Sequence, residues 1–158
     1  MAERFGELVV RQAEQSDVGA VAALRSLWSG GAEADAAFER RMADWLASER
    51  DHRTTWLALI GEFPVGMASM LEYRRMPRPE GPDSRWGYVG NVFVRADARG
   101  CGVGTSLLDE LVSAARARGY VRLVLSPSRQ AMSFFRRAGF VNSEQTASNL
   151  LLVRKLEP

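Results

Sequence analysis

Three glycines within five residues lie in the stretch 99–105, which has the sequence RGCGVGT. An apolar run at 88–94 precedes this glycine loop, and a segment with apolar residues at helical spacing, 106–118, follows it. Glycine lets a backbone approach a ligand closely, and the first amides of a helix lack partners within the helix. The helix dipole is positive at the same end. The loop therefore predicts a site for a phosphate or pyrophosphate, and a plain glycine turn is the alternative interpretation.

The glycine loop has to be held by the strand before it and the helix after it, which belong to a longer series of elements. Short apolar and β-branched runs predict strands, whereas apolar residues recurring every three or four positions predict helices. The strands expected are 8–11, 54–60, 65–73, 86–94, 121–126, 140–144 and 150–155, and the helices expected are 17–28, 35–49, 106–118 and 129–138. The predicted fold class is α/β, with a single mixed, mostly antiparallel sheet and helices on both faces.

The composition is that of an ordinary globular protein. The chain has 158 residues, which predicts one domain over 1–158 with a full hydrophobic core. Apolar residues make up 46% and charged residues 25%, which argues against disorder. No apolar run approaches the roughly 20 residues that span a bilayer, and residues 1–10 include acidic side chains and lack the apolar core of a signal peptide. We expect a cytoplasmic protein with no membrane partner.

The charge pattern and the few metal-binding side chains exclude further classes of function. The net charge is only +2, and acidic residues are interleaved among the arginines, so we expect no nucleic-acid partner. Cys101 is the single cysteine and His52 the single histidine. One of each is too few for a zinc site, and a lone cysteine forms no internal disulfide, so no metal is expected.

Two separated motifs together resemble the GCN5-related N-acetyltransferases. The stretch 99–104 follows that family's acyl-CoA loop, Gln/Arg-x-x-Gly-x-Gly/Ala, and both 91–94 (NVFV) before it and 107–108 (LL) after it match as well. The stretch 131–140 (AMSFFRRAGF) is similar to the family's late helix, which usually ends in a Gly-Phe pair. Since the beginning and the end of the chain also fit, the resemblance covers almost the whole sequence.

The resemblance implies a fold and a co-substrate. Acetyl-CoA would lie in a cleft between two splayed parallel strands, here 86–94 and 121–126, with its pantetheine arm along the first strand and its pyrophosphate on the glycine loop. The late helix would lie along the CoA. The cofactor-binding residues implied in this way are Phe93, Val94, Arg99, Gly100, Cys101, Gly102, Val103, Gly104, Thr105, Ser133, Phe134 and Arg137.

The resemblance leaves the acid and base of the reaction open. Family members often carry a glutamate base on the strand before the loop, but the two usual places are Tyr88 and Gly90 here, and the tyrosine that often protonates the thiolate is Phe135. Two substitutes are candidates for catalysis. Glu72 would relay a proton through water, or would be a solvated charge at a strand end. Ser126 would lie near the emerging thiol, or would cap the next helix.

The sequence indicates the class of reaction but does not identify the acceptor molecule. We expect an acetyl-CoA-dependent N-acetyltransferase that acts on a primary amine of a small molecule. A non-catalytic acyl-CoA-binding regulatory module is the alternative, because Phe135 and the missing strand glutamates depart from the family pattern. Four arginines within 74–85 would meet an anionic group on the acceptor, or would be solvated. Whether the protein forms a homodimer is left open by the sequence.

Overall fold

A computed structural model of the chain describes residues 6–31, 33–142 and 154. Two compact units divide the chain, Met1–Ser126 and Pro127–Pro158. The expectation of one domain over 1–158 therefore stays a prediction. Among the described residues, no helix combines the length and the apolar character that a membrane crossing requires.

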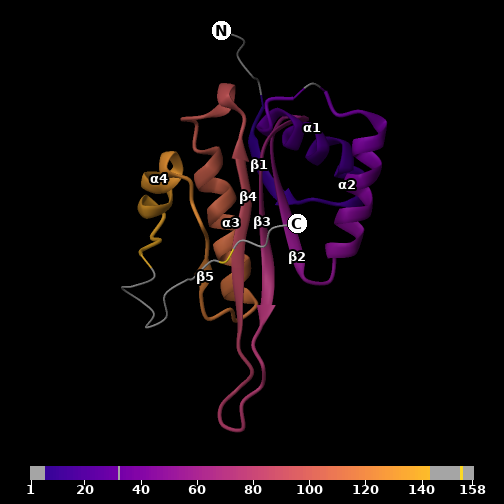
Figure 1. Cartoon of the computed structure of the whole chain (residues 1–158). Helices are drawn as coiled ribbons and strands as arrows, with labels where there is room; N and C mark the ends of the chain where they lie inside the picture. Colours follow the sequence, from indigo (N-terminus) through magenta and orange to yellow (C-terminus); the bar gives the residue numbers. More distant parts are fainter. Residues whose placement is uncertain (1–5, 32, 143–153, 155–158) are drawn as a thin grey trace. The chain divides into compact units, whose positions relative to one another are not determined.

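The first unit is built on one five-stranded sheet (Figure 1). The strands follow one another in space as they do in sequence, and every neighbouring pair is antiparallel except the last, which is parallel. This arrangement confirms the predicted mixed, mostly antiparallel sheet. The strands are β1 (Leu8–Gln12), β2 (Arg53–Ile60), β3 (Phe63–Arg74), β4 (Arg85–Val94) and β5 (Leu123–Val124).

The parallel pair is very short. Only Gly87 with Leu123 and Tyr88 with Val124 pair across β4 and β5, so the predicted strand 121–126 was too long. Strand β4 continues to Val94, and its half 89–94 pairs with no described strand on the β5 side. The two strands therefore part after Tyr88, which is the splay that the predicted fold requires.

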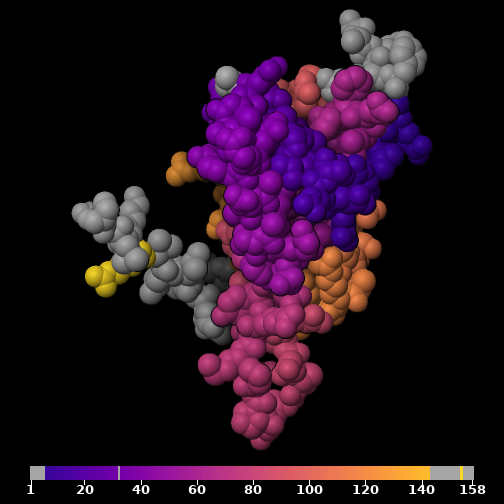
Figure 2. All heavy atoms as spheres, turned by 90° about the vertical axis from the view of Figure 1, so that its right-hand side faces the viewer, coloured from indigo at the N-terminus to yellow at the C-terminus, as the bar shows by residue number. Residues whose placement is uncertain are grey.

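Three helices cover the two faces of the sheet. Helices α1 (Val18–Trp28) and α2 (Ala36–Glu49) lie on one face, which Figure 2 shows from outside, and α3 (Val103–Ala117) lies on the other (Figure 1). A sequence signal explains where α2 begins. Asp35 accepts a hydrogen bond from the Phe38 amide at 2.7 Å and caps α2. A turn of 3₁₀ helix, Gln15–Asp17, leads into α1.

Helix α3 begins three residues earlier than the sequence predicted. Gly102 has φ +80°, a left-handed conformation that ends the loop, and the helix starts at the next residue. Val103 is buried, which fixes this start because its side chain packs into the core. Gly104 and Thr105 therefore belong to the first helical turn rather than to the loop.

Gly66 in β3 lets the start of α3 come close to the sheet. A Cβ atom on Gly66 would lie 3.0 Å from the Phe93 carbonyl oxygen, 3.1 Å from Val103 Cγ1 and 3.2 Å from Leu107 Cδ1. These distances are shorter than ordinary van der Waals contacts, so a larger residue would push α3 away. The absence of a side chain at Gly66, which is distant in sequence, therefore allows α3 and the glycine loop before it to take this position.

The second unit contains one short helix among its described residues. A 3₁₀ turn, Arg129–Ala131, precedes α4 (Met132–Arg137), where the sequence predicted one helix over 129–138. Phe135 is buried and meets Phe134 and Phe140 edge-on, with ring centroids 5.1 and 5.9 Å apart. Residues 140–142 form no strand, and the remainder of the predicted strand 140–144 lies outside the described residues, as does nearly all of 150–155.

Candidate active site

The glycine loop presents open backbone at the N-terminus of α3. Gly100 and Gly102 have φ +75° and +80°, and a Cβ atom on either would meet nothing within 4 Å. None of the amides of 100–105 donates a hydrogen bond to another described residue. A run of open amides at the positive end of a helix dipole fits the pyrophosphate of acetyl-CoA, so this part of the predicted site is suited to its ligand.

The side chains of the loop contribute little to this surface. Val103 is buried, so its side chain lies in the core. Cys101 is exposed, and its thiol lies 3.7 Å from the Arg99 carbonyl oxygen. The Arg99 side chain turns back, and its Nε donates to the Val94 carbonyl oxygen at 3.1 Å. Arg99 therefore links the loop to the end of β4.

A bulge interrupts β4 in the half that has no β5 partner. Met67 pairs with Phe93, but Ser69 pairs with Gly90, so β4 carries one residue more than β3 over this interval. Asn91 lies in the bulge with φ +53°, a left-handed conformation that asparagine tolerates better than most residues. The bulge turns the Asn91 side chain toward β3.

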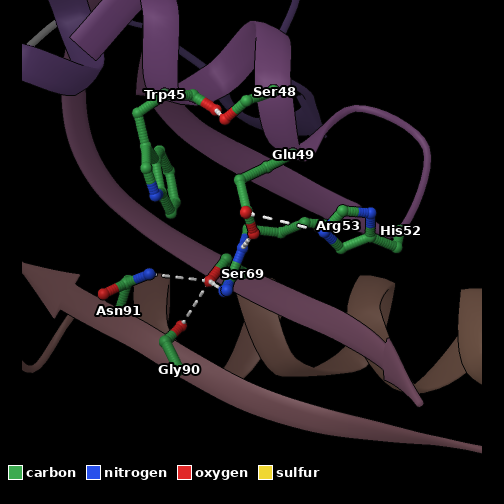
Figure 3. Close-up of polar contacts among 8 residues, drawn as sticks. All are labelled: Trp45, Ser48, Glu49, His52, Arg53, Ser69, Gly90 and Asn91. Atoms are coloured by element: carbon green, nitrogen blue, oxygen red, sulfur yellow. Dashed lines mark hydrogen bonds and ion pairs between the residues drawn. The ribbon is translucent and has the colours of Figure 1, made fainter. Parts of the chain in front are cut away.

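Ser69 is the centre of a buried polar cluster at this bulge (Figure 3). Its hydroxyl accepts a hydrogen bond from Asn91 Nδ2 at 2.9 Å and donates to the Gly90 carbonyl oxygen at 3.1 Å. Arg53 Nη1 lies 3.4 Å from the same hydroxyl, and its Nε pairs with Glu49 at 2.7 Å. Ser69 is only 1% exposed, so these bonds fix the strand register around the bulge.

The carboxylate of this cluster is held in its charged form. The hydrogen bond from Arg53 is the main reason that the pKa of Glu49 lies below its ordinary value, although burial opposes the shift. A carboxylate that already accepts from a guanidinium is a poor proton acceptor. Glu49 therefore neutralises Arg53 rather than acting as a base.

A pocket of about 360 Å³ opens beside the cluster, on the face covered by α1 and α2. Its size suits a small organic molecule. Asn91 and Ser69 contribute to its wall, so the bulged part of β4 borders the pocket. The lining residues are Val21, Arg25, Phe38, Arg41, Met42, Trp45, Thr55, Met67, Ser69 and Asn91.

The predicted catalytic residue Glu72 lies elsewhere. Ser69 and Glu72 are three residues apart on a regularly paired part of β3, so their side chains lie on opposite faces of the sheet. The Glu72 carboxylate is 11% exposed, accepts from the Tyr120 hydroxyl at 2.6 Å, and pairs with Arg74 at 2.7 Å and Arg85 at 3.5 Å. A role for Glu72 as the base stays a prediction, and this placement argues against it.

The charge state of Glu72 supports the same conclusion. The hydrogen bond from Tyr120 is the largest cause that lowers the pKa of Glu72, and Arg74 adds to it against the effect of burial. Burial and the Glu72 hydrogen bond raise the pKa of Tyr120. The pair thus forms a stable anion–phenol contact, which is typical of a structural link between β3 and the end of α3.

The structure gives the positions of the remaining predicted residues but does not test their predicted roles. Phe93 lies at the end of β4, where its ring stacks on Trp28 at a centroid distance of 5.9 Å. Ser126 is exposed after β5. In the second unit, Ser133 and Arg137 are exposed on α4 and Phe134 is half-buried. That these α4 residues join the CoA site stays a prediction.

Sequence reasoning missed the Ser69–Asn91 cluster and its pocket. One signal was present: Asn91 is a poor strand former inside an otherwise apolar and β-branched run, which is typical of a bulge. Gly90, a place where relatives often have a base, lies directly opposite Ser69 and would face the same side of the sheet. The contact between Asn91 and Ser69 therefore follows from strand register rather than from residue type.

A mixed sheet whose parallel strands part beside a glycine loop at a helix N-terminus defines an acyl-CoA-dependent N-acyltransferase fold. The chain belongs to the acetyltransferase (GNAT) family, whose model matches residues 20–140. It is an N-acetyltransferase, and acetyl-CoA is its co-substrate. The resemblance found in the two motifs is thereby confirmed, and the alternative of a non-catalytic module is not supported.

Three similar proteins illustrate the relationship. Glucosamine 6-phosphate N-acetyltransferase 1 of Oryza sativa subsp. japonica is 29% identical over 136 residues, which are 84% of this chain and 80% of that protein. A predicted acetyltransferase with acetyl-CoA from Clostridium acetobutylicum has a TM-score of 0.72 at 20% identity, covering 94% of this chain and 96% of its own. AAC(6')-Iy in complex with the bisubstrate analog CoA-S-monomethyl-acetylneamine has a TM-score of 0.72 at 17% identity, covering 95% and 99%. The two structures share the fold.

Proposed function

We propose that this enzyme transfers the acetyl group of acetyl-CoA to a primary amine of a small molecule that enters the pocket under α1 and α2. One observation carries the proposal. The bulge at Asn91 belongs both to the half of β4 that has no β5 partner and to the pocket wall. A pantetheine arm along β4 and an amine in the pocket would therefore meet at the same residues.

The residues proposed to hold the co-substrate divide by the part of CoA that they contact. The amides of 100–105 bind the pyrophosphate, and the backbone of Phe93 and Val94 runs alongside the pantetheine. Ser133, Phe134 and Arg137 of α4 add contacts along the CoA. Acetyl-CoA supplies an activated thioester, and holding it in line with the amine accounts for much of the rate enhancement.

The transfer needs a neutral amine and a stabilised carbonyl oxygen. The amine nitrogen bonds to the acetyl carbon while the carbon–sulfur bond breaks and the thiolate leaves. A backbone amide near Phe93 or Val94 donates to the carbonyl oxygen as its charge grows. Among the described residues, none of those that line the pocket carries a carboxylate. We therefore propose that the amine proton leaves to water, and that the acceptor enters as the small neutral fraction of its amine.

A thiol-release assay tests this function. The protein is mixed with acetyl-CoA and a panel of primary amines, and both free thiol and acetylated amine are measured. We expect equal amounts of both products for at least one amine. Melting curves with CoA, acetyl-CoA and ATP serve as the control, because only a ligand of the native state raises its stability. Stabilisation by ATP but not by CoA would contradict the proposal. Cytoplasmic location and a homodimer remain predictions.

A further inference from the structure

We propose that the acceptor of this enzyme is an amine with an apolar body and one anionic group, an inference that rests on the proposed function. The pocket under α1 and α2 carries two features that together define this chemistry. Most of its wall is apolar, and its charged side chains are all cationic. The cationic side chains disfavour a polycation, and the apolar wall disfavours a heavily hydroxylated sugar.

The positive charge comes from two arginines that are held in place by aromatic rings. Arg25 of α1 lies with its guanidinium carbon 4.8 Å from the Trp28 ring centroid, and it also bonds the Ser29 hydroxyl. Arg41 of α2 lies 5.4 Å from the Phe38 centroid. Stacking on a ring leaves the edge N–H groups of a guanidinium free to bind a carboxylate or phosphate.

No carboxylate balances these two charges within the described chain. Neither Arg25 nor Arg41 forms an ion pair there, whereas Arg53 below the pocket is paired with Glu49 at 2.7 Å. Arg53 also lies 5.0 Å from the Trp45 ring centroid, so it supports the wall instead of offering a free charge (Figure 3). The pocket therefore attracts an anion and repels a polycation.

The apolar part of the pocket excludes a strongly polar body. Val21, Phe38, Met42, Trp45 and Met67 form this part of the wall. The polar residue Ser69 already exchanges hydrogen bonds with Asn91 and Gly90. The other uncharged polar residues of the wall are Thr55 and Asn91. These few groups cannot pair every hydroxyl of a sugar, and each hydroxyl buried without a partner would cost about 1–3 kcal/mol. An aromatic or aliphatic body would bury its surface without that cost.

Four amines test the requirement for an apolar body and the requirement for an anionic group separately. They are 4-(aminomethyl)benzoate, which is apolar and anionic; 4-(aminomethyl)benzamide, which is apolar and neutral; glucosamine 6-phosphate, which is polar and anionic; and spermidine, which is polycationic. We expect kcat/KM for the benzoate to exceed that for the benzamide by about tenfold, as one charge-assisted contact allows, and to exceed the other two by more. An equal or higher value for any of the other three would overturn the inference.

Two matched arginine variants test whether Arg41 binds the anionic group of the acceptor. Arg41→Gln should raise KM for the benzoate by about five- to tenfold and leave KM for the benzamide unchanged. Arg40→Gln, an exposed neighbour outside the pocket, should change neither. Equal effects of Arg41→Gln on both amines would contradict the assignment.

Binding measured without turnover separates this inference from the proposed function. Calorimetric titration of each amine into the protein with CoA gives its Kd. Tighter binding of the benzoate than of the other three, without any acetylated product, would support the inference and contradict the proposed function. Product from spermidine or glucosamine 6-phosphate at the highest rate would support the proposed function and overturn the inference.

Discussion

The side-chain amide of Asn91 donates a hydrogen bond to the Ser69 hydroxyl at 2.9 Å and so joins the bulge of β4 to the middle of β3. The two residues are 22 positions apart in sequence, and both border the pocket. The bond lies in the half of β4 that has no β5 partner, along which we propose that the pantetheine lies, and it links this half to the wall of the acceptor site. A change at Ser69 should therefore alter both stability and rate.

Replacing Ser69 by alanine tests that link. The partly buried Gly90 carbonyl and Asn91 amide would lose a shared partner, the buried Ser69 hydroxyl, which we expect to lower the free energy of unfolding by about 1–3 kcal/mol and to reduce kcat. Urea unfolding and the thiol-release assay measure the two effects. Ser48→Ala is the control, because Ser48 is exposed and its hydroxyl donates to the Trp45 carbonyl oxygen at 2.8 Å, a bond within its own helix. Equal stability of the two variants would show that the cluster carries no such role.

Substitution of Gly104 tests the pyrophosphate site without straining the loop. Gly104 lies in the first turn of α3, so a side chain there meets no positive φ, and an acidic one suits the helix dipole. We expect Gly104→Asp to keep its melting temperature and to weaken CoA binding at least tenfold more than Gly104→Asn, because the two differ by one charge. Titration of CoA measures both. Equal affinities in the Asp and Asn variants would argue against an anion at this helix end.

Glu72→Gln tests a structural role through pH. The pKa of Glu72 is lowered in the folded protein, so its charge stabilises the fold above the ordinary value of 4.5, and that contribution is lost as pH falls through the folded pKa. At pH 7 we expect the variant to be less stable by about 1–2 kcal/mol. The difference should shrink below about pH 4.5. A difference that is constant from pH 7 to pH 3 would exclude this explanation.

The pH dependence of the rate tests the absence of a carboxylate base in the pocket. If the acceptor's neutral amine is the reacting species, log kcat/KM should rise with a slope near one up to the pKa of that amine. Glu72→Gln should follow the same profile, because Glu72 lies on the other face of the sheet. A plateau that begins near neutral pH and disappears in the variant would instead assign the base to Glu72.

Local chemistry explains which elements the sequence predicted well. The N-cap Asp35 fixed the start of α2 to within one residue. The glycine loop was predicted from three closely spaced glycines between a strand pattern and a helix pattern, and Gly102 does end it in a left-handed conformation. The start of α3 was placed too late because the burial of Val103 depends on close packing against Gly66, a distant strand residue. No pattern within the loop itself reveals that contact.

The pocket could not be predicted because it depends on register. Asn91 and Ser69 meet only because one extra residue in β4 shifts the pairing with β3, and the strand pattern alone does not count such residues. Glu72 lies on the opposite face from Ser69 for another reason, because the two residues are three positions apart on the same strand. Strand β5 was predicted too long because its apolar run continues past Val124 while the pairing stops there.

The most direct test of the account is the product of the reaction itself. The enzyme is incubated with acetyl-CoA and 4-(aminomethyl)benzoate, and mass spectrometry and thiol detection follow the amine and the CoA together. We predict one N-acetylated amine for each thiol released. Thiol released without acetylated amine, or acetyl-CoA bound with no product from any amine of the panel, would contradict the proposed transfer.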